Sequence, residues 1–387
     1  MFAALFEGLS QALEQNCYSK ILHSVVDIFA QQDVSIDRIQ VPMSKYSGLR
    51  HPLYGLIILT YKEGDVHTER MSHVVFSGRE KRGFTDLKAT PYGLVFDTPN
   101  QHKRIKLQSD TSFSILKNMH QEGFTEYVVF NMTLPNRMTQ FFSMATKSKY
   151  GFPAQIDALI ANLYIPFSLA LYGMYQSQVS ISLAETYLGA RTGENVLNGK
   201  IYRGAQETID AGIMFCDVRG FTSMSEQLGA KGVVEVMNDV FQIIEDEVGG
   251  EILKFIGDAL LLIFPREEHT DNQSLSRVMI HRALRAVQKV EEHGQRLGLP
   301  LSVGFGCHIG HVLYGNIGTD SRLDFTVMGP AVNLTSRLES MCSKLGTQLT
   351  VSSVVAQENQ DLLEFFGEHN LKGITESIQI WGVRTNV

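Results

Sequence analysis

The sequence predicts an α/β (α+β) chain of two domains, each with a largely antiparallel sheet and flanking helices. The first observation is length, because 387 residues exceed one average domain of roughly 150 residues. Second, apolar runs of strand length alternate with amphipathic helical patterns in both halves. Third, the pattern changes near Gly204, where longer helices begin to separate the strands.

Composition narrows the class of partner. A hydrophobic fraction of 44% and a charged fraction of 19% are ordinary for a globular protein with a sizeable core. The net charge of −7, without a basic cluster, argues against nucleic acid, whose binding relies on Lys and Arg. The cysteines are scattered and lack CxxC spacing, which predicts reduced thiols in a cytoplasmic protein: Cys17, Cys216, Cys307 and Cys342.

Two apolar segments bear on membrane association. Residues 1–16 predict an amphipathic helix rather than a signal peptide, because Glu7 and Glu14 interrupt the apolar pattern. Residues 158–174 contain Pro166 and fall short of the ~20 apolar residues that a membrane span needs. We therefore expect no membrane span, and a signal that arrives from the cytosol or from a partner.

The first half of the chain alternates short strands and helices. Strands are expected at residues 54–62, 68–77, 92–98, 104–108, 126–134 and 139–148, with a helix at 112–123. This order resembles a GAF- or PAS-type sensor domain over residues 1–152, which implies an unknown small-molecule or protein signal. Its histidines and aromatic residues could line a ligand pocket, while core packing and dimerisation are the competing interpretation.

A helical segment at residues 153–203 separates the two halves. Its apolar residues recur at helical spacing and include Ile156, Leu159, Ile160, Leu163, Leu169 and Leu171. This stripe predicts either a parallel two-helix dimerisation linker or an ordinary packed helix. Pro166 should kink the helix, because proline lacks the backbone donor that a helix interior needs.

From residue 204 onward the sequence predicts one mixed domain. Strands are expected at residues 211–218, 249–265, 301–310 and from 312, with helices at 223–250 and 274–294. The segment 249–265 forms a hairpin that turns at Gly257. A last helix opens at Pro330, a residue suited to the first helical turn. His308 and His311 are expected to have a packed or capping role rather than to bind a metal.

Two carboxylates lie at the ends of apolar strands, beside glycines. Asp217 precedes the turn at residues 219–222, and Asp258 directly follows Gly257. One such residue would be interpreted as a turn cap, but two in apolar contexts need a cation to offset lost hydration. They predict a site for two Mg²⁺ or Mn²⁺ ions whose coordination is completed by substrate phosphates. Backbone amides that follow Asp217 could cradle a triphosphate, including those of Gly220, Phe221 and Thr222.

Four sequence blocks carry a family resemblance. They are FCDVRGFTSMSE, GGEILKFIGDALLLIF, GCHIGHVLYGNIG and FTVMGPAVNLTSRLE, in this order. Together they resemble the catalytic domain of class III adenylate/guanylate cyclases over residues 204–387. The resemblance implies that fold for the second half of the chain, and a role for particular residues.

By this resemblance, Asp217 and Asp258 are the metal ligands, and Lys254 reads the adenine ring. A lysine donates hydrogen bonds and cannot accept them, which favours adenine over guanine. Thr326 stands where many relatives have an aspartate that also contacts the purine. This resembles a threonine-containing subgroup, of which some members respond to bicarbonate. Asp324 lies nearby but is out of register with that position.

The same resemblance assigns the remaining substrate contacts. Asn333 and Arg337, four residues apart on one helix face, match the pair that orients the ribose and stabilises the transition state. Arg322 and Lys372 are candidates for contacts with the triphosphate, with a solvated surface charge as the alternative.

The implied enzyme is an adenylate cyclase that converts ATP to 3′,5′-cyclic AMP and pyrophosphate, regulated by its N-terminal domain. Family members join the metal-binding half of one catalytic domain to the purine-reading half of another, which implies a homodimer here. Two alternatives stay open. The first is a guanylate or mixed-specificity cyclase, and the second is a catalytically silent nucleotide-binding module.

Overall fold

The computed structural model describes residues 18–44, 56–62, 64–71, 89–137, 139–266 and 272–383. The helix predicted at residues 1–16 and Cys17 lie outside these ranges. The chain divides into two compact units, Met1–Leu183 and Ala184–Val387. The boundary falls within helix α4 (Ile156–Leu188), so the segment expected as a linker contributes to both units.

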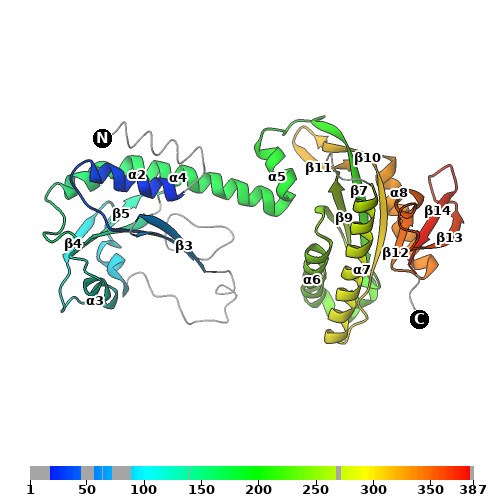
Figure 1. The fold of residues 1–387 in the computed structure, drawn as a ribbon, viewed down its shortest axis with the longest axis horizontal. Helices are drawn as coiled ribbons and strands as arrows, with labels where there is room; N and C mark the ends of the chain where they lie inside the picture. The colour runs from blue at the N-terminus through cyan, green and yellow to red at the C-terminus, as the bar shows by residue number, and fades with distance from the viewer. Residues whose placement is uncertain are drawn as a thin grey trace. The chain divides into compact units, whose positions relative to one another are not determined.

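The N-terminal unit is built on a six-stranded sheet in the order β3-β2-β1-β6-β5-β4. Figure 1 labels β3, β4 and β5 of this sheet. All five strand pairings are antiparallel. Strands β5 and β6 are buried along nearly their whole length, which explains their continuous apolar runs. The strands are β1 (Arg38–Ser44), β2 (Leu56–Lys62), β3 (Asp65–Met71), β4 (His102–Lys106), β5 (Glu126–Thr133) and β6 (Thr139–Thr146).

Helices cover both faces of this sheet. Helix α2 (Tyr18–Ala30) and α4 pack on one face, where Phe142 and Phe167 share a core. The short 3₁₀ helix η3 (Pro91–Val95) and α3 (Ser114–Gln121) pack on the other face, around Tyr127 and Phe141. Because side chains alternate along a strand, the neighbours Phe141 and Phe142 belong to opposite cores.

Some elements of the N-terminal unit differ from the sequence expectation. The strand expected at residues 92–98 is wrong, because residues 91–95 form η3. The reason is local: Thr90 accepts a hydrogen bond from the Tyr92 amide, and Pro91 suits a first helical turn. Helix α2 and strand β1 are additional to the expected elements.

Helix α4 passes through Pro166 as one helix of 33 residues. Five members of its predicted apolar stripe are buried, but Leu169 is 56% exposed. At 3.6 residues per turn, Leu169 lies roughly 160° around the helix from the buried Leu171. By length and composition α4 could cross a membrane, which is weak evidence because core helices of soluble proteins pass the same test. Its first half packs in the core of the N-terminal unit, from Ile156 to Met174.

The C-terminal unit is built on an eight-stranded sheet that follows the path β13-β14-β12-β10-β7-β9-β8, with β11 paired to β10. Only β10 and β12 are parallel among the described strands. This mixed, largely antiparallel sheet with flanking helices confirms the predicted fold class. The strands are β7 (Gln206–Val218), β8 (Glu251–Ile256), β9 (Ala259–Pro265), β10 (Val303–Thr319), β11 (Arg322–Met328), β12 (Leu349–Ser352), β13 (Glu364–His369) and β14 (Ile378–Gly382).

Helices lie on both faces of the second sheet as well. Helices α6 (Phe221–Val248) and α7 (Asn272–Leu297) share one core with Phe305 of β10. Helix α8 (Pro330–Leu345) crosses the opposite face at Gly306, where a Cβ would collide with the α8 backbone. Pro330 occupies the first turn of α8, as expected. The remaining helices are α5 (Ala190–Leu197) and α9 (Ser353–Ala356).

Burial favours the neutral forms of the described cysteines and of His308 in the C-terminal unit. The described cysteines, Cys216, Cys307 and Cys342, are free and buried. Burial raises the pKa of each thiol, so the prediction of reduced, buried thiols is confirmed for these three. Burial lowers the pKa of His308 to about 4, and its Nδ1 lies 2.7 Å from Ser352 Oγ. His308 is therefore packed, as expected.

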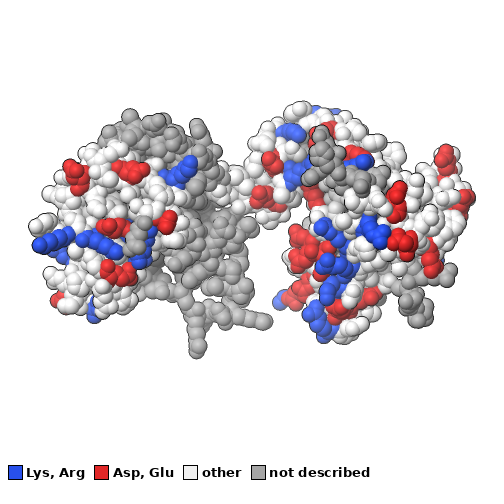
Figure 2. All heavy atoms as spheres, viewed as in Figure 1, with Lys and Arg blue, Asp and Glu red and all other residues white. Residues whose placement is uncertain are grey.

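Surface charges of both signs are interspersed on the face shown in Figure 2. The net charge of −7 is therefore not concentrated in one acidic region there. Exposed pairs such as Arg277 with Asp361, 2.9 Å apart, contribute little to stability, because water screens the attraction. The stability of both units consequently rests on their apolar cores.

Candidate active site

Asp217 and Asp258 meet where the central strands of the C-terminal unit end. Asp217 lies near the end of β7, in register with Ala259 of β9. Asp258 occupies the turn before β9, and its carbonyl accepts a hydrogen bond of 3.3 Å from the Val218 amide. Gly257 permits this turn by adopting a left-handed φ of 67°. The backbone register therefore brings both predicted metal ligands together.

The Asp217 carboxylate carries charge that its surroundings neutralise poorly. Burial raises the pKa of Asp217, the nearby Asp258 charge raises it further, and Arg219 lowers it. Arg219 Nη1 lies 3.8 Å from Asp217 Oδ1, whereas Arg219 Nη2 lies 2.8 Å from Glu339 Oε1. Two adjacent carboxylates with so little compensation fit divalent cations. The described residues contain no group of three or more metal-ligating side chains, so water and substrate phosphates would complete the coordination of a bound ion.

Arg219 and Glu339 form a polar pair beside the carboxylates that the sequence reasoning missed. Arg219 Nη1 donates to Ser343 Oγ at 2.8 Å, and Gly304 of β10 leaves the space through which the guanidinium passes. Burial raises the pKa of Glu339 to about 7, against the opposing effect of Arg219. The pair joins the end of β7 to α8, 120 positions later, so no local pattern could have revealed it.

Helix α6 begins directly after the strand that carries Asp217. Gly220 turns the chain with a left-handed φ of 70°, and the Met224 amide bonds to the Gly220 carbonyl at 3.0 Å. The amides of Phe221, Thr222 and Ser223 precede that bond and have no acceptor within the helix. A helix N-terminus of this kind suits phosphate, because free amides and the helix dipole both favour an anion.

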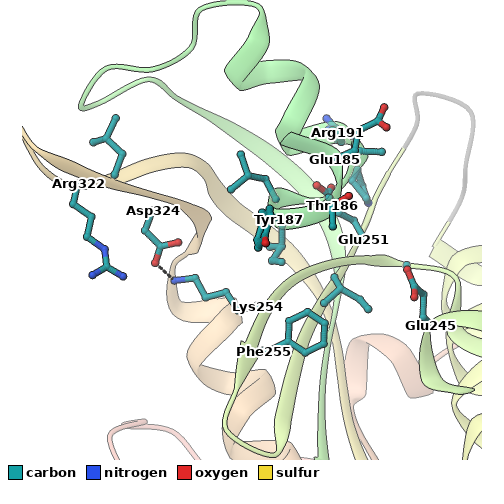
Figure 3. A pocket seen from close by; sticks show the side chains of 18 of the residues that line it. Glu185, Thr186, Tyr187, Arg191, Glu245, Glu251, Lys254, Phe255, Arg322 and Asp324 are labelled. Carbon is teal, nitrogen blue, oxygen red and sulfur yellow. Dashed lines mark hydrogen bonds and ion pairs between the residues drawn. The ribbon is translucent and has the colours of Figure 1, made fainter. Parts of the chain in front are cut away.

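Lys254 lies elsewhere, in a pocket of about 940 Å³. Figure 3 shows Lys254 of β8 and Asp324 of β11 pointing toward one another. Their Nζ and Oδ2 atoms are 2.5 Å apart. Arg322 lines the same pocket, whereas Asp217 and Asp258 do not. The predicted substrate contacts therefore fall into two groups on one unit.

Asp324, and not Thr326, is the partner of Lys254 in this structure. Thr326 is 5% exposed and lies in register with Gly315 of β10. Residues 324 and 326 share one face of β11, because side chains alternate along a strand. The Lys254–Asp324 contact spans 70 positions of the chain, and this separation is why the sequence pattern did not identify it.

Asn333 and Arg337 lie four residues apart on the exposed side of α8. Neither side chain lines the Lys254 pocket. Lys372 is exposed in the turn after β13 and is also absent from the pocket lining. The structure thus joins Asp217 with Asp258, and Lys254 with Arg322, but leaves these three side chains outside the pocket.

A polar contact fastens helix α5 to strand β8. Glu251 Oε1 accepts hydrogen bonds from the Thr192 amide at 3.2 Å, the Thr192 hydroxyl at 2.9 Å and the Tyr314 hydroxyl at 3.1 Å. The Arg191 guanidinium lies 5.3 Å from the centre of the Tyr314 ring. Glu251 begins the strand that carries Lys254, so this contact fixes one wall of the pocket.

The C-terminal unit matches one protein family. Residues 204–383 fit the sequence model described as "Adenylate and Guanylate cyclase catalytic domain". The match covers a little under half of the chain and supports a catalytic domain of the adenylate/guanylate cyclase type over these residues. The resemblance expected from the four sequence blocks is confirmed at this level.

Individual relatives share the same half of the chain. The adenylate cyclase of Anabaena cylindrica is 35% identical over 192 residues, which cover 47% of this chain and 38% of that protein. The solved adenylyl cyclase CyaB from P. aeruginosa is 26% identical with a TM-score of 0.41, over 47% of this chain and 97% of that one. The solved guanylyl cyclase Cya2 is 32% identical with a TM-score of 0.38, over 46% of this chain and 95% of that one. The chain spans well under two thirds of the length of the curated relatives that it matches.

Proposed function

We propose that this chain is an adenylate cyclase that converts ATP to 3′,5′-cyclic AMP and pyrophosphate as a homodimer. The observation that carries the proposal is the division of the site into two groups. Asp217 and Asp258 meet at the end of β7, whereas Lys254 faces the pocket with Asp324. A nucleotide held by both groups requires a second copy, which also supplies a second equivalent site.

The pocket suits the edge of an adenine ring. Lys254 offers hydrogen-bond donors to a ring nitrogen, and the Asp324 carboxylate accepts from an exocyclic amino group. Their ion pair holds the two side chains side by side. The acceptor expected from Thr326 is therefore assigned to Asp324 instead, and the likeness to a threonine-containing subgroup stays a prediction.

The pair of carboxylates, Asp217 and Asp258, suits the triphosphate end of the nucleotide. Asp217 and Asp258 would hold two divalent ions, and the first amides of α6 would bind phosphate oxygens. Bound Mg²⁺ or Mn²⁺ supplies Lewis-acid polarisation of the phosphate and acidifies the ribose 3′-hydroxyl. In the reaction, a bond forms between the 3′-oxygen and the α-phosphorus, the bond to the leaving pyrophosphate breaks, and the 3′-hydroxyl proton leaves to solvent.

Asn333 and Arg337 are proposed to act on this step. Asn333 would orient the ribose, while Arg337 would offset the negative charge that builds on the α-phosphate and the leaving group. Both side chains are exposed on α8, which leaves them available to a nucleotide at a dimer interface. Regulation by the N-terminal unit and a cytoplasmic location complete the proposal.

GTP is the second candidate substrate. The same Lys254–Asp324 pair offers guanine a donor for its carbonyl oxygen and an acceptor for its N–H edge. The test is product formation by the purified full chain, given ATP and GTP in parallel with Mn²⁺ or Mg²⁺. We expect cyclic AMP from ATP, little product from GTP, and none from Asp217→Ala. Absence of both cyclic products would instead support a nucleotide-binding module without catalysis.

A mixing experiment tests the shared site directly. Asp217→Ala and Arg337→Ala chains, each inactive alone, should regain activity when mixed, because one interface then contains an intact set of side chains. The matched control mixes Asp217→Ala with Asp258→Ala, which damage the same half and should stay inactive. Failure of the first mixture, with dimers present, would contradict the composite site.

A further inference from the structure

Four polar side chains gather on one face of the N-terminal sheet, beneath η3. They are Arg38 of β1, Tyr127 of β5, Ser143 of β6 and Tyr92 of η3. Tyr127 faces the core that also contains Tyr92 and Phe141. This polar group, called the Arg38 cluster below, interrupts a core that is otherwise apolar.

The strand register explains how the cluster forms. Strand β6 lies between β1 and β5, and its Ala145 is in register with Arg38 on one side and Tyr127 on the other. One step along, Ser143 is in register with Gln40. Because opposed side chains on neighbouring strands are close, the small side chain of Ala145 leaves room between Arg38 and Tyr127.

The hydroxyls of the cluster are buried donors. Tyr92 OH lies 3.1 Å from Ser143 Oγ, and Tyr92, Tyr127 and Ser143 are 9%, 5% and 2% exposed. Burial raises the pKa of Tyr92 to about 12 and that of Tyr127 well above its usual value. Both phenols therefore keep their protons at neutral pH. The Tyr92, Tyr127 and Ser143 hydroxyls bond to one another, and each can both donate and accept hydrogen bonds.

Arg38 brings a positive charge to the same place. Its charge lowers the pKa of both phenols, against the larger effect of burial, which indicates that it lies close to them. The Arg38 Nε atom is buried and has no hydrogen-bond partner in the described part of the chain. Native structures rarely leave such a group unpaired, because a buried charged donor is costly without an acceptor.

Nearby carboxylates are engaged elsewhere. Asp37 Oδ2 accepts from the Lys147 amide at 2.7 Å and from Thr146 Oγ1 at 3.2 Å. Glu126 pairs with Arg104, whose Nε lies 2.7 Å from Glu126 Oε1. Among the described residues, these two carboxylates are therefore not acceptors for Arg38 Nε, and a bound ligand would supply one.

We propose that Arg38, Tyr92, Tyr127 and Ser143 bind a small carboxylate in the N-terminal unit. A guanidinium binds a planar carboxylate through parallel hydrogen bonds, and the three hydroxyls add donors around it. The same hydrogen-bond donors would also bind a tetrahedral oxyanion such as phosphate. The experiment therefore compares carboxylates with phosphate. The proposal concerns the N-terminal unit and does not rest on the proposed cyclase activity.

The test is calorimetry on the full chain without nucleotide. After dialysis into chloride buffer, the protein is titrated with sodium acetate, sodium pyruvate or sodium phosphate, with sodium chloride at equal ionic strength as the reference. We expect heat of binding, and a raised thermal transition, with acetate or pyruvate. Arg38→Met should weaken that binding roughly 10- to 100-fold, since it removes a charge-assisted contact. Arg137→Met, at an exposed turn of the same unit, should bind as the unchanged protein does.

Two further measurements keep the proposal open to failure. Tyr127→Phe retains the ring and should weaken binding several-fold, which covers the case in which Arg38→Met does not fold. Without a ligand, Arg38→Met should melt no lower than the unchanged chain, because the Arg38 Nε has no hydrogen-bond partner to lose in the described part of the chain; a purely structural arginine would lower the transition. Binding of phosphate alone would overturn the carboxylate assignment. Binding of no probe, or equal binding by Arg38→Met, would overturn the site.

Discussion

In the C-terminal unit, the Asp217–Asp258 pair and the Lys254–Asp324 pair are positioned by different kinds of contact. Asp217 and Asp258 are positioned by the backbone, because β7 and β9 pair through Asp217 and Ala259 and the Val218 amide reaches the Asp258 carbonyl. Lys254 and Asp324 come from β8 and β11, which are not paired with one another, and meet through an exposed ion pair. The first arrangement is rigid, while the second can adjust. We infer that changes at the first abolish activity and changes at the second tune it.

The largest effect on activity is expected at the Asp217–Asp258 pair. Asp217→Asn should lower the turnover of ATP at least ~10³-fold, because a metal ligand carries several kcal/mol of transition-state stabilisation. The thermal transition should not fall, since the substitution also removes repulsion between two carboxylates. Steady-state kinetics with Mn²⁺ and calorimetry check both expectations. Activity within tenfold of the unchanged chain would contradict the metal assignment.

The sheet that both regions share should respond to pH through His308. Burial lowers its pKa to about 4 from 6.5, so the unfolded chain binds more protons between those values and stability rises with pH there. As pH falls from about 6.5 to 4, His308 should cost up to about 3 kcal/mol of stability. Denaturant unfolding at several pH values measures this. His308→Gln should flatten the slope in that window, whereas an unchanged slope would assign the pH dependence to other groups.

The contact between α5 and β8 should matter for stability. Glu251→Gln weakens charge-assisted bonds from Thr192 and Tyr314 and should lower the unfolding free energy by about 2 kcal/mol. The matched control is Glu194→Gln, at an exposed position of helix α5. This substitution should change stability by less than about 0.5 kcal/mol. If the variants unfold alike, Glu251 does not fasten α5 to the sheet.

The smallest effect is expected in the Lys254 pocket. Substitutions there test whether Asp324 or Thr326 accepts a hydrogen bond from the purine. Asp324→Asn should lower kcat/KM for ATP roughly tenfold, because it removes a charged acceptor. Its effect on stability should stay within about 1 kcal/mol, as for other exposed ion pairs. Thr326→Val keeps the shape of a buried residue and should change kcat/KM less than twofold if Asp324 is the acceptor. The reverse ranking would restore Thr326 as the purine contact.

The site could be predicted from sequence where the cause is local. Asp217 and Asp258 each follow an apolar strand and adjoin a glycine turn, so their type and position were readable from a few residues. The strand expected at residues 92–98 failed because Thr90 and Pro91, just outside the apolar run, start the helix η3 instead. Leu169 matched a helical spacing but lies on the exposed side of α4, since spacing alone does not say which neighbour covers a helix.

The sequence by itself determined the order of elements from β7 to α8, the family blocks, and the two carboxylates that end apolar strands. It missed β12, β13 and β14, and it expected a break near residue 311 where β10 runs unbroken from Val303 to Thr319. The features that it determined follow from side-chain periodicity and turn chemistry, which act over a few residues. Only the tertiary structure decided that Lys254 pairs with Asp324, that Arg219 turns to Glu339, and that the Arg38 Nε has no hydrogen-bond partner among the described residues. Those outcomes depend on strand register and on which faces meet across many tens of positions, and a one-residue change of register would send each side chain to the opposite face.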